Sequence, residues 1–129
     1  MNSLIYRKDS KKELYEIRDA LENALESSQF GILTEIDVAK IMKKKGIPFD
    51  KEFLLLGICN PSFAKEALTI NPDVSISLPC NIAIEKTASG STVMLARPTF
   101  VVNYYKNEEL EDLGQKAEDI LIQAIEEVV

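Results

Sequence analysis

Histidine is absent from the 129 residues of this chain, and cysteine occurs only twice, as Cys59 and Cys80. Without an imidazole, a single chain can build no Ser-His or Cys-His nucleophile pair and no histidine-ligated metal centre. Two thiolates would fill only half of a tetrahedral zinc shell, so a zinc site would need four thiolates shared across a dimer twofold axis. We therefore expect no metal and no cofactor, with a disulfide or a shared metal site as the alternative for the two thiols.

An excess of positive charge and long apolar runs are also missing. The formal net charge is −6, which argues against binding to the phosphate backbone of nucleic acids. The basic run Lys43-Lys44-Lys45 closes a helical pattern, where cations complement the helix dipole. No apolar run approaches the roughly 20 residues of a membrane span, and the first residues lack the order of a signal peptide. We expect a cytoplasmic protein with reduced thiols and no membrane partner.

Hydrophobic residues make up 46% of the chain and charged residues 28%, which is typical of an ordinary globular protein. We expect one domain over residues 1–129, because this length can bury a sufficient core without disulfides. Hydrophobic spacing of about 3.6 residues and capping signals predict helices over 11–28, 37–46, 61–69 and 107–129. Alternating or continuous apolar segments predict strands over 3–8, 30–36, 53–59, 80–86 and 91–98.

These elements predict an α+β fold with two layers. Two long helices pack on one face of a mostly antiparallel sheet, and short helices connect the strands. The last two strands form a hairpin around Ser89 and Gly90. Strand 53–59 is continuously apolar, which predicts burial on both of its faces. In the last helix one stripe should be buried, made of Leu110, Leu113, Ala117, Ile120, Leu121, Ala124 and Val128.

Several residues give local signals for the helix ends. Ser10 and Glu13 have the spacing of a capping box, so Ser10 is predicted to cap the first helix. Asp37 and Asn107 are the predicted caps of the second and last helices. Asn60 precedes Pro61, and this order predicts a third helix with Asn60 as its cap and Pro61 as its first residue. The apolar side of that helix, which should face the core, consists of Phe63, Ala64, Ala67 and Leu68.

Both cysteines are followed directly by asparagine, in Cys59-Asn60-Pro61 and Pro79-Cys80-Asn81. Cys59 ends one predicted strand at a helix N-terminus, where backbone N–H groups can lower the pKa of a thiol. If the two strands are neighbours, both thiols and both amides meet at one end of the sheet. The candidate pocket is therefore formed by Cys59, Asn60, Pro61, Pro79, Cys80 and Asn81.

Three interpretations of the two thiols stay open. Each cysteine can act as a small buried hydrophobe with no chemical role. The thiols can instead line a ligand or redox pocket, or form a disulfide or metal site. Outside this pocket, Glu35 and Asp37 form a weak candidate for a paired-carboxylate site, although capping explains Asp37. Tyr104-Tyr105 forms either an aromatic contact patch or a core or dimer contact.

The segments FGILTEIDV, LLLGICNPSFAKEAL and NPDVSISLPCNIAI resemble the domain-of-unknown-function 302 family, in order from about Phe30 to Pro98. The motif positions that carry the resemblance are Cys59, Asn60, Pro61, Leu78, Pro79, Cys80 and Asn81. The resemblance implies a β-α-β4-α fold of the TATA-binding-protein-like type and a homodimer, and it implies no assigned reaction. It also implies an acidic residue before Pro98, where this chain has Arg97.

From these observations we expect a homodimeric binding module whose pocket at the Cys-Asn dipeptides takes a small polar ligand. The first alternative is a thiol-dependent redox or sulfur-transfer protein that uses Cys59 or Cys80. The second is a protein-protein interaction module that uses an exposed face or edge of the sheet, with no small-molecule site. The sequence alone does not decide whether the protein is an enzyme.

Overall fold

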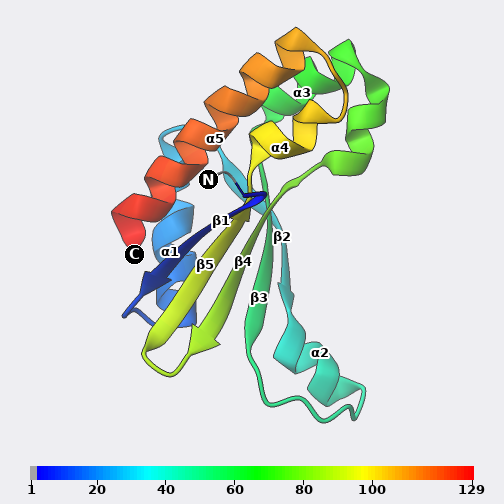
Figure 1. Cartoon of the computed structure of the whole chain (residues 1–129). Helices are drawn as coiled ribbons and strands as arrows, with labels where there is room; N and C mark the ends of the chain where they lie inside the picture. Colours follow the sequence, from blue (N-terminus) through cyan, green and yellow to red (C-terminus); the bar gives the residue numbers. More distant parts are fainter. Residues whose placement is uncertain (1–2) are drawn as a thin grey trace.

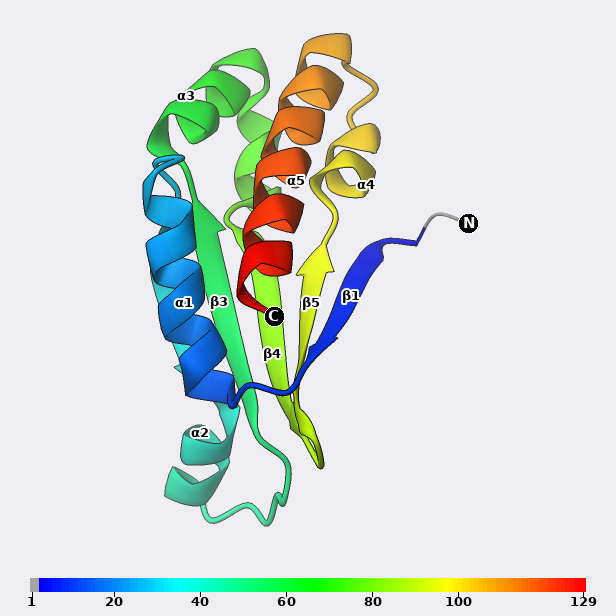
Figure 2. The ribbon, with the colours of Figure 1, turned by 90° about the vertical axis from the view of Figure 1, so that its left-hand side faces the viewer.

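The computed structural model describes residues 3–129, which form a five-stranded antiparallel sheet with its two long helices on one face (Figures 1 and 2). The strands lie in the order β1-β5-β4-β3-β2. Their bounds are β1 Ile5–Ser10, β2 Gly31–Asp37, β3 Phe53–Cys59, β4 Cys80–Thr87 and β5 Gly90–Ala96. The helices are α1 Leu14–Glu26, α2 Val38–Lys44, α3 Pro61–Ile70, α4 Pro98–Asn103 and α5 Glu108–Val128, with a 3-10 helix η1 at Pro72–Ser77.

This architecture confirms the predicted fold class, because the two long helices α1 and α5 lie on the same side of the sheet (Figure 2). The helix stripes pack directly on alternate residues of the inner strands. Fully buried members of this core include Leu21 of α1, Leu121 of α5 and Leu54 of β3. The apolar residues of the strands recur every 2 positions and those of the helices about every 3.6 positions, and both sets meet in this one layer. The sequence pattern was therefore sufficient to predict the core.

The helix caps were predicted correctly at three positions and wrongly at one. Asp37, Asn60 and Asn107 each accept backbone N–H bonds at the start of α2, α3 and α5. Ser10 does not cap α1, because it still belongs to β1 and pairs with Ser91 of β5. Helix α1 begins later, at Leu14, and its cap is Glu13, whose carboxylate accepts from the Tyr15 N–H. Sheet pairing thus overrides the capping box.

The prediction that the third strand is buried on both faces was wrong. Leu54, Leu56 and Ile58 face the helices, whereas Leu55 on the opposite face is 38% exposed. Across that face a row of residues is aligned by the strand register, and the row consists of Arg7, Met94, Ala83, Leu55 and Ile36. The helices α1 and α5 lie on the opposite face, in front of the sheet in Figure 2. We call these five residues the open-face row.

Two short helices were not predicted. Helix α4 begins at Pro98, inside the region expected to be strand, and η1 follows the Asn71 cap where the sequence indicated only the end of α3. Both lie beside the N-terminal half of α5, at the upper end of the sheet in Figure 1. Leu68 was predicted to face the core, but it is exposed because α3 presents Ala67 to α5 instead.

Helix α2 extends the sheet at its other end and has no buried residue (Figure 1). Its C-terminus carries Lys43 and Lys44, as the dipole argument predicted, and Gly46 follows with a positive φ of 70°. In residues 3–129, none of the helices combines the length and the hydrophobicity that crossing a membrane requires.

Candidate functional site

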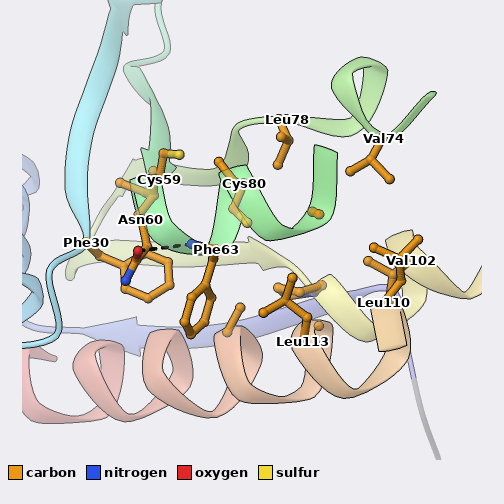
Figure 3. A pocket seen from close by; sticks show the side chains of 16 residues that line it. Phe30, Cys59, Asn60, Phe63, Val74, Leu78, Cys80, Val102, Leu110 and Leu113 are labelled. Carbon is orange, nitrogen blue, oxygen red and sulfur yellow. Dashed lines mark hydrogen bonds between the residues drawn. The ribbon is translucent and has the colours of Figure 1, made fainter. Parts of the chain in front are cut away.

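A cavity of about 70 Å³ lies at the upper end of the sheet, where β3 ends and β4 begins. Figure 3 shows side chains from β4, α3, η1 and α5 converging on it. Its wall is mostly apolar and includes Phe30, Phe63, Leu78, Val102, Leu110 and Leu113. The ring centroids of Phe30 and Phe63 lie 5.6 Å apart in an edge-to-face arrangement, and these rings close one end of the cavity. We call this space the inner cavity.

The strand register brings the two Cys-Asn dipeptides together at this end of the sheet. Cys80 pairs with Ile58, the residue before Cys59, and Asn81 pairs with Gly57. Cys59, Asn60 and Cys80 line the inner cavity. Pro61 does not line it, because it is the exposed first residue of α3. Pro79 and Asn81 line a neighbouring hollow that also touches Cys80.

The two cysteines are free thiols, and their environment is opposite to the one expected. Burial raises the pKa of Cys59, and burial together with the nearby Cys59 raises the pKa of Cys80 to about 11. The sequence hypothesis of a lowered thiol pKa was therefore wrong, because burial disfavours the charged thiolate at both positions. In Figure 3 the Cys80 sulfur points among the cavity side chains, whereas the Cys59 sulfur points away from them.

Asn60 is fully occupied by the fold. Its Oδ1 accepts from the backbone N–H groups of Ser62 and Phe63 at 2.9 and 3.2 Å. Its Nδ2 donates to the carbonyl oxygen of Ser28 at 3.1 Å, which ties the start of α3 to the end of α1. The side chain is buried, so a ligand in the inner cavity finds no free amide at this position.

The glycine of the LLLGIC segment is required by the packing of Pro79. A Cβ on Gly57 would overlap the hydroxyl of Thr34 and lie 2.7 Å from Cγ of Pro79. Pro79, which follows a cis peptide bond, thus lies over the one position of β3 that lacks a side chain. The motif residues are therefore coupled to each other through the fold.

A buried ion pair beside the inner cavity was missed at the sequence level. Glu118 of α5 is 2% exposed, and its Oε2 accepts from Nη2 and Nε of Arg97 at 2.9 and 3.2 Å. Its Oε1 accepts from the hydroxyl and the N–H of Thr99 at 2.6 and 3.1 Å. Burial opposes ionisation, but the bonds from Thr99 and Arg97 outweigh it and lower the pKa of Glu118. The available signal was a carboxylate between Ala117 and Leu121 of the apolar stripe.

The weaker candidates from the sequence are the carboxylates Glu35 and Asp37 and the tyrosine pair. Glu35 accepts from Nε of Arg18 at 2.7 Å, and Asp37 accepts from the Tyr15 hydroxyl at 2.5 Å while it caps α2. The carboxylates thus hold α1 against β2, and they do not face a shared cavity. Of the two tyrosines, Tyr105 is half-buried and contacts the cluster around Val74, whereas the Tyr104 side chain is largely exposed.

Residues 6–128 match the family described as Domain of unknown function DUF302. The chain belongs to the DUF302 family. The crystal structure of an uncharacterized conserved DUF302 protein from Bacillus stearothermophilus is similar over 99% of this chain and 100% of that chain. Its TM-score is 0.93 and the sequences are 23% identical, so this likeness concerns the fold alone. A comparison with curated protein sequences gave no match.

Membership in the DUF302 family confirms the resemblance carried by the Cys-Asn motifs. The five strands and the two long helices follow the implied β-α-β4-α order, with α2, α3, η1 and α4 inserted between them. The acidic residue that the resemblance implied before Pro98 is replaced by Arg97, and the structure supplies a reason. The Arg97 guanidinium neutralises the buried carboxylate of Glu118. In this DUF302 chain, position 97 therefore holds α4 against α5.

Proposed function

We propose that this DUF302 protein binds a small, mainly apolar ligand in the inner cavity. The observation that carries the proposal is a cavity of about 70 Å³ whose lining is apolar except for Asn60, which is bonded within the fold, and the two cysteines. A ligand that filled the space would recover the dispersion contacts that the lining side chains lack.

The lining favours an apolar ligand over the polar ligand expected from the sequence. Both Nδ2 and Oδ1 of Asn60 are already engaged in hydrogen bonds within the fold, and the Cys80 thiol is neutral at ordinary pH. A polar group placed there would lose its hydrogen bonds to water and gain none. The raised thiol pKa values also favour binding over redox or sulfur-transfer chemistry, because the thiolate is the nucleophile in both.

Binding of benzene tests this proposal. We expect saturable shifts of cavity methyl signals in NMR spectra and a benzene-dependent rise in melting temperature. Ala67→Leu, which adds three carbon atoms on the cavity wall, should abolish both effects. Ala39→Leu, on the half-buried side of α2 and away from the cavity, should leave both unchanged.

If Ala67→Leu overpacks the core and unfolds, the smaller Ala64→Val on the same wall replaces it. Wild-type protein that shows no saturable binding would refute the proposal. Equal binding by the cavity variant and by Ala39→Leu would also refute it, because the ligand would then occupy another place.

We further infer that two copies associate through the uncovered face of the sheet, as a homodimer. The open-face row crosses all five strands, so its length is roughly 20 Å at the usual strand spacing. Four of its five residues are apolar. An uncovered apolar sheet face is typical of an interaction surface.

Two free cysteines support the cytoplasmic location predicted from the sequence.

Leu55→Glu should convert the dimer into a monomer in sedimentation velocity experiments at micromolar concentration. Leu55 lies next to the central Ala83 of the open-face row, so a dimer of the variant would bury two unpaired carboxylates there. Leu68→Glu, at a 39% exposed position of α3, a helix that packs on α5 in the helical layer, is the matched control and should stay dimeric. Wild-type protein that sediments as a monomer at high concentration would contradict the inference.

A further inference from the structure

A hollow of about 430 Å³ lies at the lower end of the molecule in Figure 1, between α2 and the loop that leads to β3. Helix α2 contributes Ala39 and Lys43 to its wall, and the loop contributes Ile47, Phe49 and Lys51. No residue of the open-face row lines this space, so it is distinct from the surface proposed for the dimer contact. We call it the α2 hollow.

The apolar part of the α2 hollow is open to solvent. Ile47 is 52% exposed and Phe49 is 40% exposed, and α2 itself has no buried residue. The Phe49 ring stacks with that of Phe53, with centroids 6.3 Å apart, so it is held in the wall of the hollow. An aromatic ring fixed beside an open hollow is suited to receive an apolar side chain.

The segment around the hollow is positively charged, although the chain as a whole has a net charge of −6. Residues 39–51 contain one acid, Asp50, and five lysines, so their net charge is +4; the lysines are Lys40, Lys43, Lys44, Lys45 and Lys51. Within residues 3–129 none of these lysines forms an ion pair. Glu52, by contrast, is neutralised by Lys86 at 3.1 Å. The dipole of one short helix accounts for Lys43 and Lys44 but not for a cluster of five cations.

We propose that the α2 hollow binds an acidic segment of a partner protein, which places one large apolar side chain in the hollow and its carboxylates beside the surrounding lysines. Protein interfaces commonly combine an apolar anchor in a pocket with a polar rim. Opposite charges on the two partners accelerate and orient their association. This inference depends neither on a ligand in the inner cavity nor on the dimer.

An acidic protein segment fits these observations better than a phosphate group or a membrane surface. Residues 39–51 contain no arginine, the residue whose planar fork matches a phosphate group, and dispersed lysines suit several separate carboxylates. Phe49 packs against Phe53 and lines a concave space, whereas a membrane-binding helix turns its apolar side chains into the lipid.

Selection from a random peptide library displayed on phage, with the wild-type protein as bait, tests the proposal. We expect the enriched peptides to share several acidic residues around one large apolar residue. The most enriched peptide is then measured by fluorescence anisotropy. The double variant Lys43→Glu/Lys51→Glu should bind it at least about tenfold more weakly, and added salt should weaken binding to the wild type.

Two variants make this measurement specific for the hollow. Ile47→Asn removes apolar wall surface and should also weaken binding, although no lysine is changed. Asp50→Asn removes the unpaired carboxylate of the wall, so it should strengthen binding about 2- to 5-fold, the effect of one exposed charge. A purely structural role of these residues would not produce a gain in affinity.

The matched control is Lys65→Glu/Lys116→Glu, which changes the net charge equally at exposed positions of α3 and α5 and should bind like the wild type. All these positions are exposed, so unchanged melting temperatures should verify the fold. The proposal is overturned if no peptide family is enriched, if the enriched family lacks acidic residues, or if both double variants bind equally. Binding of the wild type to phosphatidylserine vesicles without peptide enrichment would assign the lysines to a membrane surface instead.

Discussion

Replacing Gly90 with alanine should lower the free energy of unfolding by about 3 kcal/mol. Gly90 begins β5 with a φ of 149°, which L side chains rarely adopt. A Cβ at this position would overlap the carbonyl oxygen of Ser10 and lie 2.7 Å from Cα and C of Lys11. These are backbone atoms, and the Ser91 hydroxyl holds the same segment by donating to the Lys12 carbonyl at 2.8 Å. The segment cannot retreat without breaking this bond.

Urea unfolding of the variant and of Gly31→Ala measures the effect. Gly31 also lies in a strand, but a Cβ there meets no atom within 4 Å and its φ is not positive. We expect Gly31→Ala to change the free energy of unfolding by less than about 1 kcal/mol. A Gly90→Ala variant as stable as Gly31→Ala would show that the β1–α1 connection adapts to the added methyl group.

Replacing Glu118 with alanine should lower the free energy of unfolding by about 3 kcal/mol, near the lower end of the range for a broken buried ion pair. The Arg97 guanidinium and the Thr99 hydroxyl and N–H all lose their acceptor. The lower end is appropriate because the Arg97 side chain is 25% exposed and can reach water. Thermal and urea unfolding provide the measurement.

Glu22→Ala is the matched control for Glu118. Glu22 also pairs with an arginine, because its Oε1 lies 2.9 Å from Nη1 of Arg18 in the same helix. The Glu22 side chain, however, is 53% exposed. Surface pairs of this kind contribute at most about 1 kcal/mol. Similar losses for the two variants would contradict a dominant role for the buried pair between α4 and α5.

The contribution of Glu118 should also depend on pH in a defined direction. Its folded-state pKa is lowered, because hydrogen bonds from Thr99 and Arg97 outweigh the effect of burial. The stabilisation is therefore complete above the unfolded pKa of about 4.3 and is lost as pH falls through the lower folded value. The difference in stability between the wild type and Glu118→Gln should be constant at neutral pH and shrink below about pH 4.

Much of the fold could be predicted because local and global preferences agree. Asn60 and Pro61 specify a helix start by hydrogen bonding and by a fixed φ, which are properties of the residues themselves. The stripes of α1 and α5 depend only on periodicity. Where two local signals competed, as at Ser10, the pairing with Ser91 prevailed, and that partner is 81 positions away in the sequence.

The candidate site was predicted in position but not in character. The two Cys-Asn dipeptides meet because β3 and β4 are neighbours, as the sequence analysis required. Thiol pKa values depend on desolvation, and desolvation depends on helices such as α4 that the sequence pattern did not predict. The sequence also could not show which of the two asparagines is engaged in hydrogen bonds. Only the surrounding backbone distinguishes the bonded Asn60 from the exposed Asn81.

The sequence by itself determined the order of the five strands and of the helices α1, α2, α3 and α5, the caps at Asp37, Asn60 and Asn107, the absence of histidine chemistry and the family resemblance. These features depend on residue type and on short-range spacing. Only the tertiary structure decided that one sheet face is open at Leu55, that the cavity wall is mostly apolar and that Arg97 neutralises Glu118. Burial, cavity shape and ion pairing are set by residues far apart in the chain, so they exist only once the layers have packed.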